Sequence, residues 1–505
     1  MSEQKLKRGA VAKDTVVYML AKGIEAVVGV LTMSVMTYLF VSKQMGQYST
    51  INIAITTIGL VAVQWLAQAV LRYVNKYEVQ GHQEEFFATV FNAWLKINLV
   101  VIAVSTLIII FLRSVLNGLE LEKLYWLKDS IRVLSIGVLW FVTYNTSQLV
   151  ISVVAAMRRS GLNLLLSVVA VTGKLIFIIV FCKLFGSKIE WIFLSYFLTD
   201  GIVSLIGIFK LKLYKYIKPK KKSKEILVEL RKYGTPLMGN MVTTSVLNKS
   251  DIYIVTAFLG SSAAGIYQTN YSLVATAFTM LSSAVMRGHY PTILRVWSEG
   301  RQEEANQLVS SAARFYLLLA VPAVVGVGTL SDVIAKALYA PEYFVGNSIM
   351  VWVALAMLIL GLTEYNIKPW EMNAKTHAIF LRSLVGGIVN VVLNLIFVPI
   401  FGYKTAAVTT FLGFFVYFIL ARIGTRQYAQ WKLPIYTYVR IIGSSLIMAL
   451  VLVLLKKVLP FNIMTLIVMV GIGVVVYGVV LGVTGEIKDE VNSILRVLNN
   501  KRKGD

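Results

Sequence analysis

Fourteen apolar blocks of about 20 residues divide this chain of 505 residues, and they constrain its fold more than any other feature. A helix of about 20 apolar residues crosses roughly 30 Å of hydrocarbon, the thickness of a bilayer core. Only 15% of the residues are charged, against roughly 25% in soluble domains. The sequence therefore predicts an all-α polytopic membrane protein. The expected spans are 14–40, 48–71, 87–112, 131–154, 162–184, 190–210, 237–258, 263–287, 309–330, 347–367, 379–400, 405–424, 438–458 and 463–483.

The distribution of lysine and arginine indicates which side of the membrane each connection faces. With a cytoplasmic N-terminus, the inner segments hold roughly 34 of these residues and the outer segments roughly 11, as expected if positive residues collect in cytoplasmic loops. The net charge of +24 has the same explanation and requires no nucleic-acid partner. We expect both termini in the cytoplasm and a first helix that is not cleaved.

A strongly basic inner connection at 210–234 divides the spans into six, six and two. Its principal role is expected to be that of a topology anchor, and a specific site for lipid headgroups is the alternative. Its second part has the helical spacing of an amphipathic helix on the membrane surface. The predicted domains are an N-terminal six-helix lobe (1–213), a basic cytoplasmic linker (214–235), a C-terminal six-helix lobe (236–428), two further spans (429–485) and a cytoplasmic amphipathic tail (486–505).

A short pattern recurs where the second and the eighth blocks begin. The segments read MGQYSTIN (45–52) and AGIYQTNY (264–271), and the matched residues are Gly46, Tyr48 and Thr50 with Gly265, Tyr267 and Thr269. Because six helices separate the two segments, both halves have the same orientation in the membrane. We therefore expect two pseudo-symmetric lobes related by an axis along the membrane normal, as in transporters built from parallel repeats.

Eight ionisable residues lie away from the ends of the expected spans. They are Lys22, Glu25, Lys96, Lys174, Asp200, Lys249, Asp251 and Glu364. A charge at the bilayer centre costs about 2.5–3.5 kcal/mol on insertion scales, so these side chains should face the bundle interior, pair with one another or line water. The alternative to a functional role is that they form interhelical ion pairs that fix helix positions.

The spacing of two of these pairs predicts different surroundings. Lys22 and Glu25 are three residues apart and share one face of a helix. Lys249 and Asp251 are two residues apart, so they point in nearly opposite directions. We expect one of the latter two to face a cavity and the other to face a neighbouring helix.

The sequence offers little for catalysis or for metal binding. The segment VTGKL (171–175) lacks the first glycine of a P-loop. The three histidines, His82, His289 and His377, lie in expected inner loops without metal-ligand spacing. The single cysteine, Cys182, is expected to be an inert packing residue. No metal site and no cofactor are expected, apart from a possible coupling proton or sodium ion.

Two longer segments carry a resemblance to a known family. Residues 229–274 contain Tyr233, Gly234, Pro236, Asp251, Gly265 and Tyr267, and residues 390–410 contain Asn390, Asn394, Pro399, Gly402, Ala406 and Ala407. With Gly46, Tyr48 and Arg72, this pattern resembles the O-antigen (Wzx-type) and exopolysaccharide flippases of the multidrug/oligosaccharidyl-lipid/polysaccharide exporter superfamily. The chain lacks the arginine cluster in the first helix that is typical of the lipid II branch, so the resemblance does not favour lipid II as substrate.

The resemblance implies a fold and an activity. The fold would be a V-shaped pair of six-helix lobes around a central cavity, with two further helices beside it. The activity would be the transfer of a polyprenyl-pyrophosphate-linked oligosaccharide from the inner to the outer leaflet of the bacterial cytoplasmic membrane by alternating access. Glycosyltransferases and a polysaccharide polymerase would be its partners, together with membrane lipid.

The charged residues can be assigned roles in such a process. Lys22, Lys174 and Lys249 would hold phosphate oxygens as point charges, and Arg72 and Arg287 would capture the headgroup near the inner mouth. Glu25, Asp200, Asp251 and Glu364 would carry a coupling proton or sodium ion. These nine residues are the expected functional site.

Two other functions remain as alternatives. A cation-coupled exporter of small drugs would share the fold, but its cavity should hold carboxylates and aromatic residues with few lysines. An integral membrane enzyme of envelope polysaccharide assembly should carry catalytic groups on a long outer loop or a buried histidine. The outer loops here are short, so an enzyme is disfavoured.

Overall fold

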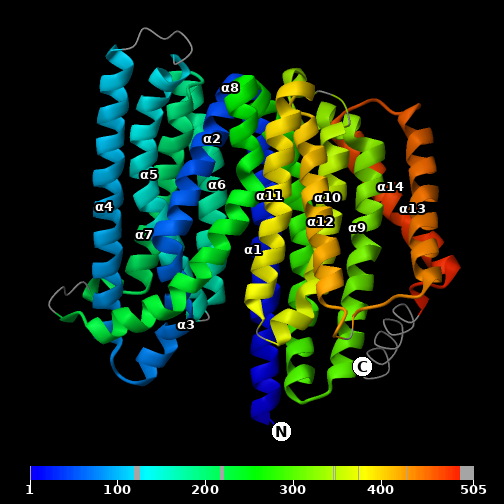
Figure 1. Cartoon of the computed structure of the whole chain (residues 1–505), viewed down its shortest axis with the longest axis horizontal. Helices are drawn as coiled ribbons and strands as arrows, with labels where there is room; N and C mark the ends of the chain where they lie inside the picture. The colour runs from blue at the N-terminus through cyan, green and yellow to red at the C-terminus, as the bar shows by residue number, and fades with distance from the viewer. Residues whose placement is uncertain are drawn as a thin grey trace. The chain divides into compact units, whose positions relative to one another are not determined.

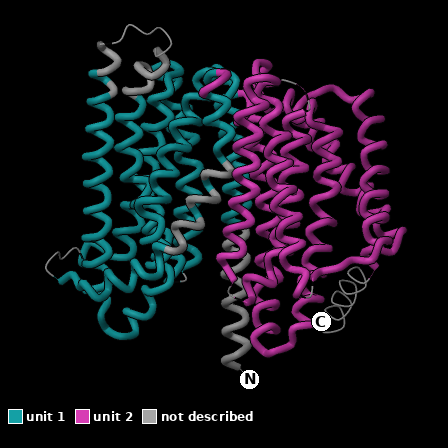
Figure 2. Tube along the Cα trace, in the orientation of Figure 1, with its two compact units in different colours: residues 1–256, 260–265 teal, residues 257–259, 266–505 magenta. Residues whose placement is uncertain are grey.

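The structure is a computed structural model and is nearly all helical (Figure 1). It describes residues 2–118, 125–157, 159–216, 221–344, 346, 348–373, 375–428 and 430–488. Over these residues the chain forms helices α1 to α14 with short π- and 3-10 segments, and no strand. The chain packs as two compact units, residues 1–256 with 260–265, and residues 257–259 with 266–505 (Figure 2).

The first unit contains the helices up to the middle of α8. They are α1 (Ser2–Leu39), α2 (Ser42–Gly59), α3 (Trp65–Val79), α4 (Gln83–Gly118), α5 (Tyr125–Ala156), α6 (Ser160–Phe185), α7 (Ile189–Lys210) and the first part of α8 (Lys224–Ser298). A π-helical segment, Leu60–Gln64, continues α2 into α3, so the two helices form one span. A 3-10 turn, η3 (Leu213–Tyr216), follows α7.

The second unit contains the remaining helices. They are the rest of α8, α9 (Gln302–Leu338), α10 (Ser348–Met372), α11 (Thr376–Phe401), α12 (Thr405–Gly424), α13 (Ile435–Lys456) and α14 (Ile463–Thr484), with a 3-10 turn, η5, at Pro341–Tyr343. Helix α9 packs on α10, α13 and α14, and α12 packs on α10 and α11.

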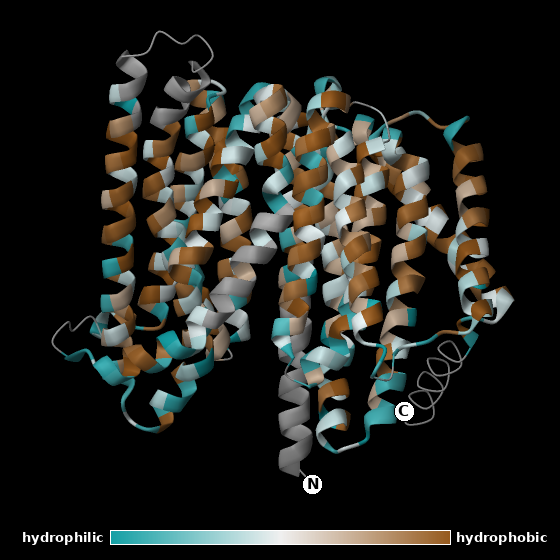
Figure 3. Cartoon of the chain, viewed as in Figure 1, coloured by the Kyte–Doolittle hydropathy of each residue, from teal (hydrophilic) through white to brown (hydrophobic). Residues whose placement is uncertain are grey.

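Twelve of the expected spans are long and apolar enough in the described part of the chain to cross a membrane, and the ribbon in Figure 3 is coloured by the hydropathy of each residue. The two remaining expected spans, 237–258 and 263–287, both fall on α8. There Gly260 adopts φ 82°, a left-handed conformation that ends one helical segment before the next begins. The multi-pass membrane fold is thus confirmed, whereas the total of fourteen spans and the side on which the termini lie stay predictions.

The basic connection differs from the expectation in one respect. Residues from Lys224 onward are helical, as predicted, but Ile226 and Leu230 are buried in one apolar cluster with residues of α3 such as Val70 and Val74. The apolar face of this segment therefore packs on protein instead of lying on lipid. The two compact units divide near residues 256–266, within α8. The predicted boundaries of the two lobes, at residues 213 and 236, stay a prediction. Most of the predicted tail, from residue 489 onward, lies outside the described residues.

The two glycines of the recurring pattern approach each other closely within the first unit. A Cβ atom on Gly46 would lie 1.7 Å from the backbone oxygen of Ser261, and one on Gly265 would lie 2.1 Å from that of Ser42. Each glycine thus meets the residue four positions before the other glycine. The two-fold relation between the halves of the chain stays a prediction.

Candidate functional site

Asp200 of α7 lies at the centre of a buried charged cluster in the first unit. Its Oδ1 atom is 3.1 Å from Nζ of Lys174 on α6, and its Oδ2 atom accepts a hydrogen bond of 2.8 Å from the indole of Trp140 on α5. Asp200 is only 3% exposed, whereas the side chain of Lys174 is 23% exposed. Two residues that the sequence assigned to different roles, phosphate binding and ion coupling, are therefore partners.

A close approach of α6 to α7 brings this pair together. Gly173 precedes Lys174, and Thr199 precedes Asp200. A Cβ atom on Gly173 would lie 2.8 Å from Cγ2 of Thr199, so only glycine allows this separation. The small residue on α6 thereby places the ammonium group within reach of the carboxylate.

Aromatic side chains form the other side of the cluster. Nζ of Lys174 lies 4.9 Å from the ring centroid of Tyr196, a cation–π distance. The hydroxyl groups of Tyr196 and Tyr48 are 2.8 Å apart, and the Tyr196 ring packs edge-on against Trp140. An ammonium group has three donors, so Lys174 can hold Asp200 and still donate to an anion from its exposed side.

The charges of α1 and α8 differ in their degree of pairing. Lys22 and Glu25 form the ion pair that their spacing predicts, with side chains 50% and 26% exposed. Asp251 is 2% exposed, whereas Lys249 is half-buried. Lys249 forms no salt bridge with any other residue in the described part of the chain. Lys96 on α4 is exposed.

The two predicted capture arginines are both exposed, but only Arg72 is held in place. Its guanidinium lies 4.3 Å from the ring centroid of Tyr233. Beside it, Lys76 bonds Glu229 at 2.6 Å, and Tyr77 also donates to that carboxylate. These two hydrogen bonds lower the pKa of Glu229. No described residue forms a salt bridge with Arg287.

A second charge cluster lies in the second unit. It joins Glu364, which the sequence analysis named and whose side chain is 43% exposed, to Lys368 and Glu371, which it missed. Lys368 of α10 is 4% exposed and lies 3.6 Å from Glu364 and 2.6 Å from Glu371. Its Nζ atom is 4.7 Å from the ring centroid of Tyr290. The sequence does contain a signal for this cluster, because Glu364 and Glu371 lie four residues before and three residues after Lys368. Lys368 was overlooked because the expected span ended at residue 367.

Glu486 is the centre of another cluster that sequence reasoning did not find. It is 5% exposed, and its carboxylate lies 2.8 Å from Nε of Arg314 and 3.3 Å from Nη1 of Arg440. These contacts fasten the end of α14 to α9 and α13. Glu486 directly follows Gly485, the C-cap of α14. Nothing in the sequence around it indicates that arginines on α9 and α13 are its partners.

Asn390 and Asn394, two residues of the family resemblance, take part in a chain of hydrogen bonds between α11 and α12. Asn394 donates to Asn390 at 3.0 Å, Asn390 donates to Thr410 at 3.1 Å, and Thr409 donates to Asn394 at 2.7 Å. All four residues are buried. In this arrangement the network joins two helices.

No group of three or more potential metal ligands occurs among the described residues.

Comparison with known proteins gives a consistent result. Residues 11–297, more than half of the chain, match the family described as "Polysaccharide biosynthesis protein". The chain is 24% identical over 328 residues to the probable low-salt glycan biosynthesis flippase Agl15 of Haloferax volcanii, covering 64% of this chain and 67% of Agl15. It is also 24% identical over 268 residues to the probable flippase AglR of the same organism, covering 52% of this chain and 54% of AglR.

The fold has a solved counterpart. A structure of the lipid II flippase MurJ, in an inward closed conformation, superposes with a TM-score of 0.72 at 16% identity, covering 95% of this chain and 100% of that one. At this identity the likeness shows the fold alone. From the family match and the shared fold together, the chain is a multi-pass membrane protein that belongs to the polysaccharide biosynthesis protein family.

Proposed function

We propose that this protein is a flippase for a lipid-linked glycan. The observation that carries the proposal is the buried cluster at Asp200, in which a partly exposed lysine lies inside an apolar span. A phosphate-linked sugar headgroup cannot cross hydrocarbon without charged or polar groups to replace its water. The relatives Agl15 and AglR are named as probable flippases, not as enzymes.

The substrate class follows from the charges. Lys174 and Lys249 offer ammonium groups to phosphate oxygens, and Lys22 adds a third. A polyprenyl-pyrophosphate-linked oligosaccharide would supply phosphate oxygens for these ammonium groups. The protein would move it from the inner to the outer leaflet of the cytoplasmic membrane. The glycosyltransferases that build such a substrate and the polymerase that consumes it would then act on either side of the transport step.

The Lys174–Asp200 pair suggests how substrate and ion binding can be coupled. Asp200 and a substrate phosphate compete for the same ammonium group. Phosphate binding to Lys174 would release the carboxylate, which then takes up a proton or a sodium ion. Glu25, Asp251 and Glu364 are the other acids in a position to carry that ion. Alternating access would follow from a difference in affinity between the two states of the protein.

Lysines within the spans distinguish this proposal from the drug exporter of the same fold. A site for cationic drugs should present carboxylates without competing ammonium groups. Here Lys174 neutralises Asp200, Lys368 lies between two glutamates, and Lys249 has no acidic partner among the described residues. The charges therefore favour an anionic cargo.

Reconstitution tests the proposal directly. Vesicles that contain the protein and a fluorescent polyprenyl-pyrophosphate oligosaccharide report translocation as loss of signal to a membrane-impermeant quencher. We expect Lys249→Ala to reduce the initial rate by about tenfold, because the lost phosphate contact is charge-assisted. The matched control is Lys183→Ala, which removes an exposed lysine at the end of α6. A wild-type rate for Lys249→Ala would remove this residue from the site, and no translocation by the wild-type protein would refute the flippase.

A further inference from the structure

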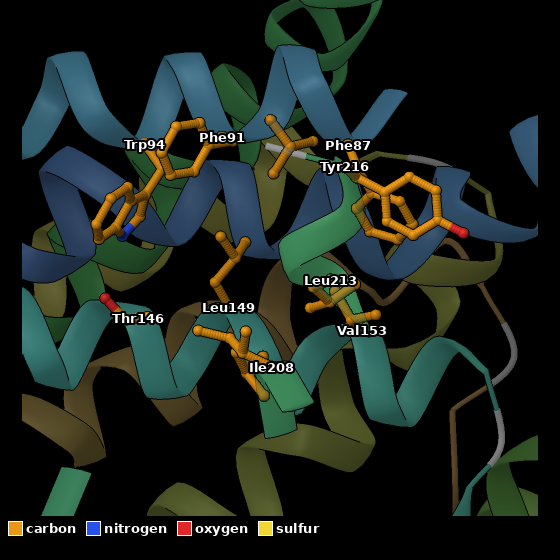
Figure 4. A pocket seen from close by; sticks show the side chains of 11 residues that line it. Phe87, Phe91, Trp94, Thr146, Leu149, Val153, Ile208, Leu213 and Tyr216 are labelled. Atoms are coloured by element: carbon orange, nitrogen blue, oxygen red, sulfur yellow. The ribbon is translucent and has the colours of Figure 1, made fainter. Parts of the chain in front are cut away.

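An apolar pocket in the first unit lies apart from the charged cluster and has no part in the function proposed above. Its empty volume, including the open mouth, is about 630 Å³. Figure 4 shows side chains of α4, α5, α7 and η3 around it. The residues that the following argument uses are Phe87, Phe91, Trp94, Thr146, Leu213 and Tyr216.

Two aromatic pairs form the walls of the pocket. Phe91 stacks on Trp94 with ring centroids 5.7 Å apart, and Phe87 stacks on Tyr216 with centroids 5.2 Å apart (Figure 4). The hydroxyl of Thr146 donates to a backbone oxygen of its own helix, so it leaves the lining apolar. Such walls select an apolar chain.

One polar atom in this lining lacks a partner. The indole nitrogen of Trp94 is buried and makes no hydrogen bond to any described residue. A buried donor without an acceptor costs about 1–3 kcal/mol. The surrounding side chains leave no room for an acceptor at this nitrogen, so a ligand of the pocket meets only the apolar part of the indole.

Positive charges flank the residues that close the pocket at η3. Lys212 and Lys215 are exposed and adjoin Leu213 and Tyr216 in the chain. Neither lysine forms a salt bridge within the described ranges, whereas nearby Lys221 is paired with Glu84.

The backbone at this rim is unusual. Lys212 adopts φ 54°, and it is the one residue other than glycine with a positive φ in the part of the chain that the structure describes. Lysine seldom adopts this left-handed conformation. Here it ends α7 and turns the chain so that Leu213 and Tyr216 cover the pocket, with the lysines beside them.

We propose that this pocket binds an acyl chain of one anionic phospholipid, whose phosphate is held by Lys212 and Lys215. Basic pockets between membrane helices are known sites for anionic lipid headgroups. The same apolar walls would also admit a polyprenyl tail, so the experiment includes polyprenyl phosphate as a competitor. The lipid is a resident of the first unit, independent of the transported cargo.

Tryptophan quenching by brominated lipids tests the proposal on the full-length protein. Vesicles of phosphatidylcholine with a minority of phosphatidylglycerol are prepared in two forms, with bromine on the acyl chains of one lipid or of the other. Trp94 is one of nine tryptophans. The quenching at Trp94 is therefore the difference between the quenching of the wild-type protein and that of Trp94→Phe. We expect the quenching at Trp94 to show a preference of roughly 10- to 30-fold for phosphatidylglycerol over phosphatidylcholine, because two lysines near the membrane surface attract the anionic headgroup.

Charge variants separate the headgroup contact from general attraction to the membrane. Lys212→Ala/Lys215→Ala should abolish the preference at Trp94. The matched control is Lys183→Ala/Lys188→Ala, which removes two exposed lysines between α6 and α7 in the same unit, at the opposite end of α7 from Lys212. That control should leave the preference unchanged.

Three results would overturn the proposal. Equal quenching of Trp94 by the two lipids would mean that the pocket has no headgroup selectivity. A preference that survives Lys212→Ala/Lys215→Ala would place the headgroup elsewhere. Loss of the quenching on addition of polyprenyl phosphate, at an amount at which phosphatidic acid leaves it unchanged, would identify the occupant as the isoprenoid chain.

Discussion

At the scale of single residues, Asp200 shows how the environment of a charge decides its role. The sequence places an aspartate in an apolar span, and a lone charge there is costly. The structure supplies an ammonium group and an indole N–H as its partners, both from other helices. Removing one partner of a buried pair leaves the other charge uncompensated, which costs more than the pair contributes.

This reasoning predicts the stability of variants of the pair. Asp200→Asn should lower the free energy of unfolding by about 3 kcal/mol, because Lys174 then lacks its counterion. The double variant Asp200→Asn/Lys174→Met should lose less than the sum of the two single changes. Cys182 is the only cysteine and is buried, so its reaction with a thiol-specific fluorophore during heating reports unfolding. Additive losses would show that the two side chains do not interact.

At the scale of elements, the apolar blocks predicted helix positions well, because the length of a span is set by the bilayer. The block at 405–424 coincides with α12 at both ends, and 463–483 differs from α14 by one residue. The amphipathic segment after 224 was harder to place. Helical spacing is the same whether the apolar face meets lipid or protein, and only the packing of Ile226 and Leu230 decides between the two.

The close approach of α2 to α8 yields a prediction at this scale. Gly46→Ala and Gly265→Ala each place a methyl group against a backbone oxygen that cannot move without its helix. We expect each variant to lose about 1–3 kcal/mol of stability, as overpacking does. Gly29→Ala is the control, since a Cβ atom there meets nothing within 4 Å. Equal thermal stability of the three variants in the Cys182 assay would refute the close contact.

At the scale of the whole molecule, charge asymmetry between loops predicts the orientation in the membrane. Lysine and arginine near the ends of spans collect on the cytoplasmic side. This expectation is independent of the fold likeness to MurJ. An even number of spans would place both termini on the cytoplasmic side and the turn at 402–404, between α11 and α12, outside.

Epitope tags test this orientation in intact cells. Tags at either terminus should resist an external protease until the membrane is permeabilised. A tag inserted at 402–404 should be cleaved at once, and a cytoplasmic protein serves as the control for lysis. Termini on opposite sides would exclude the total of fourteen spans.

The sequence by itself determined that the chain is a polytopic helical membrane protein, where most of its helices lie and which residues carry charge within them. These properties follow from local hydrophobicity and from the fixed thickness of the bilayer. Only the tertiary structure decided which charges are paired. Trp140, Lys174 and Asp200 are separated by tens of residues, and Glu486 meets Arg314 across 172. Such contacts depend on how helices pack against one another, and the periodicity of a single helix carries no information about its neighbours.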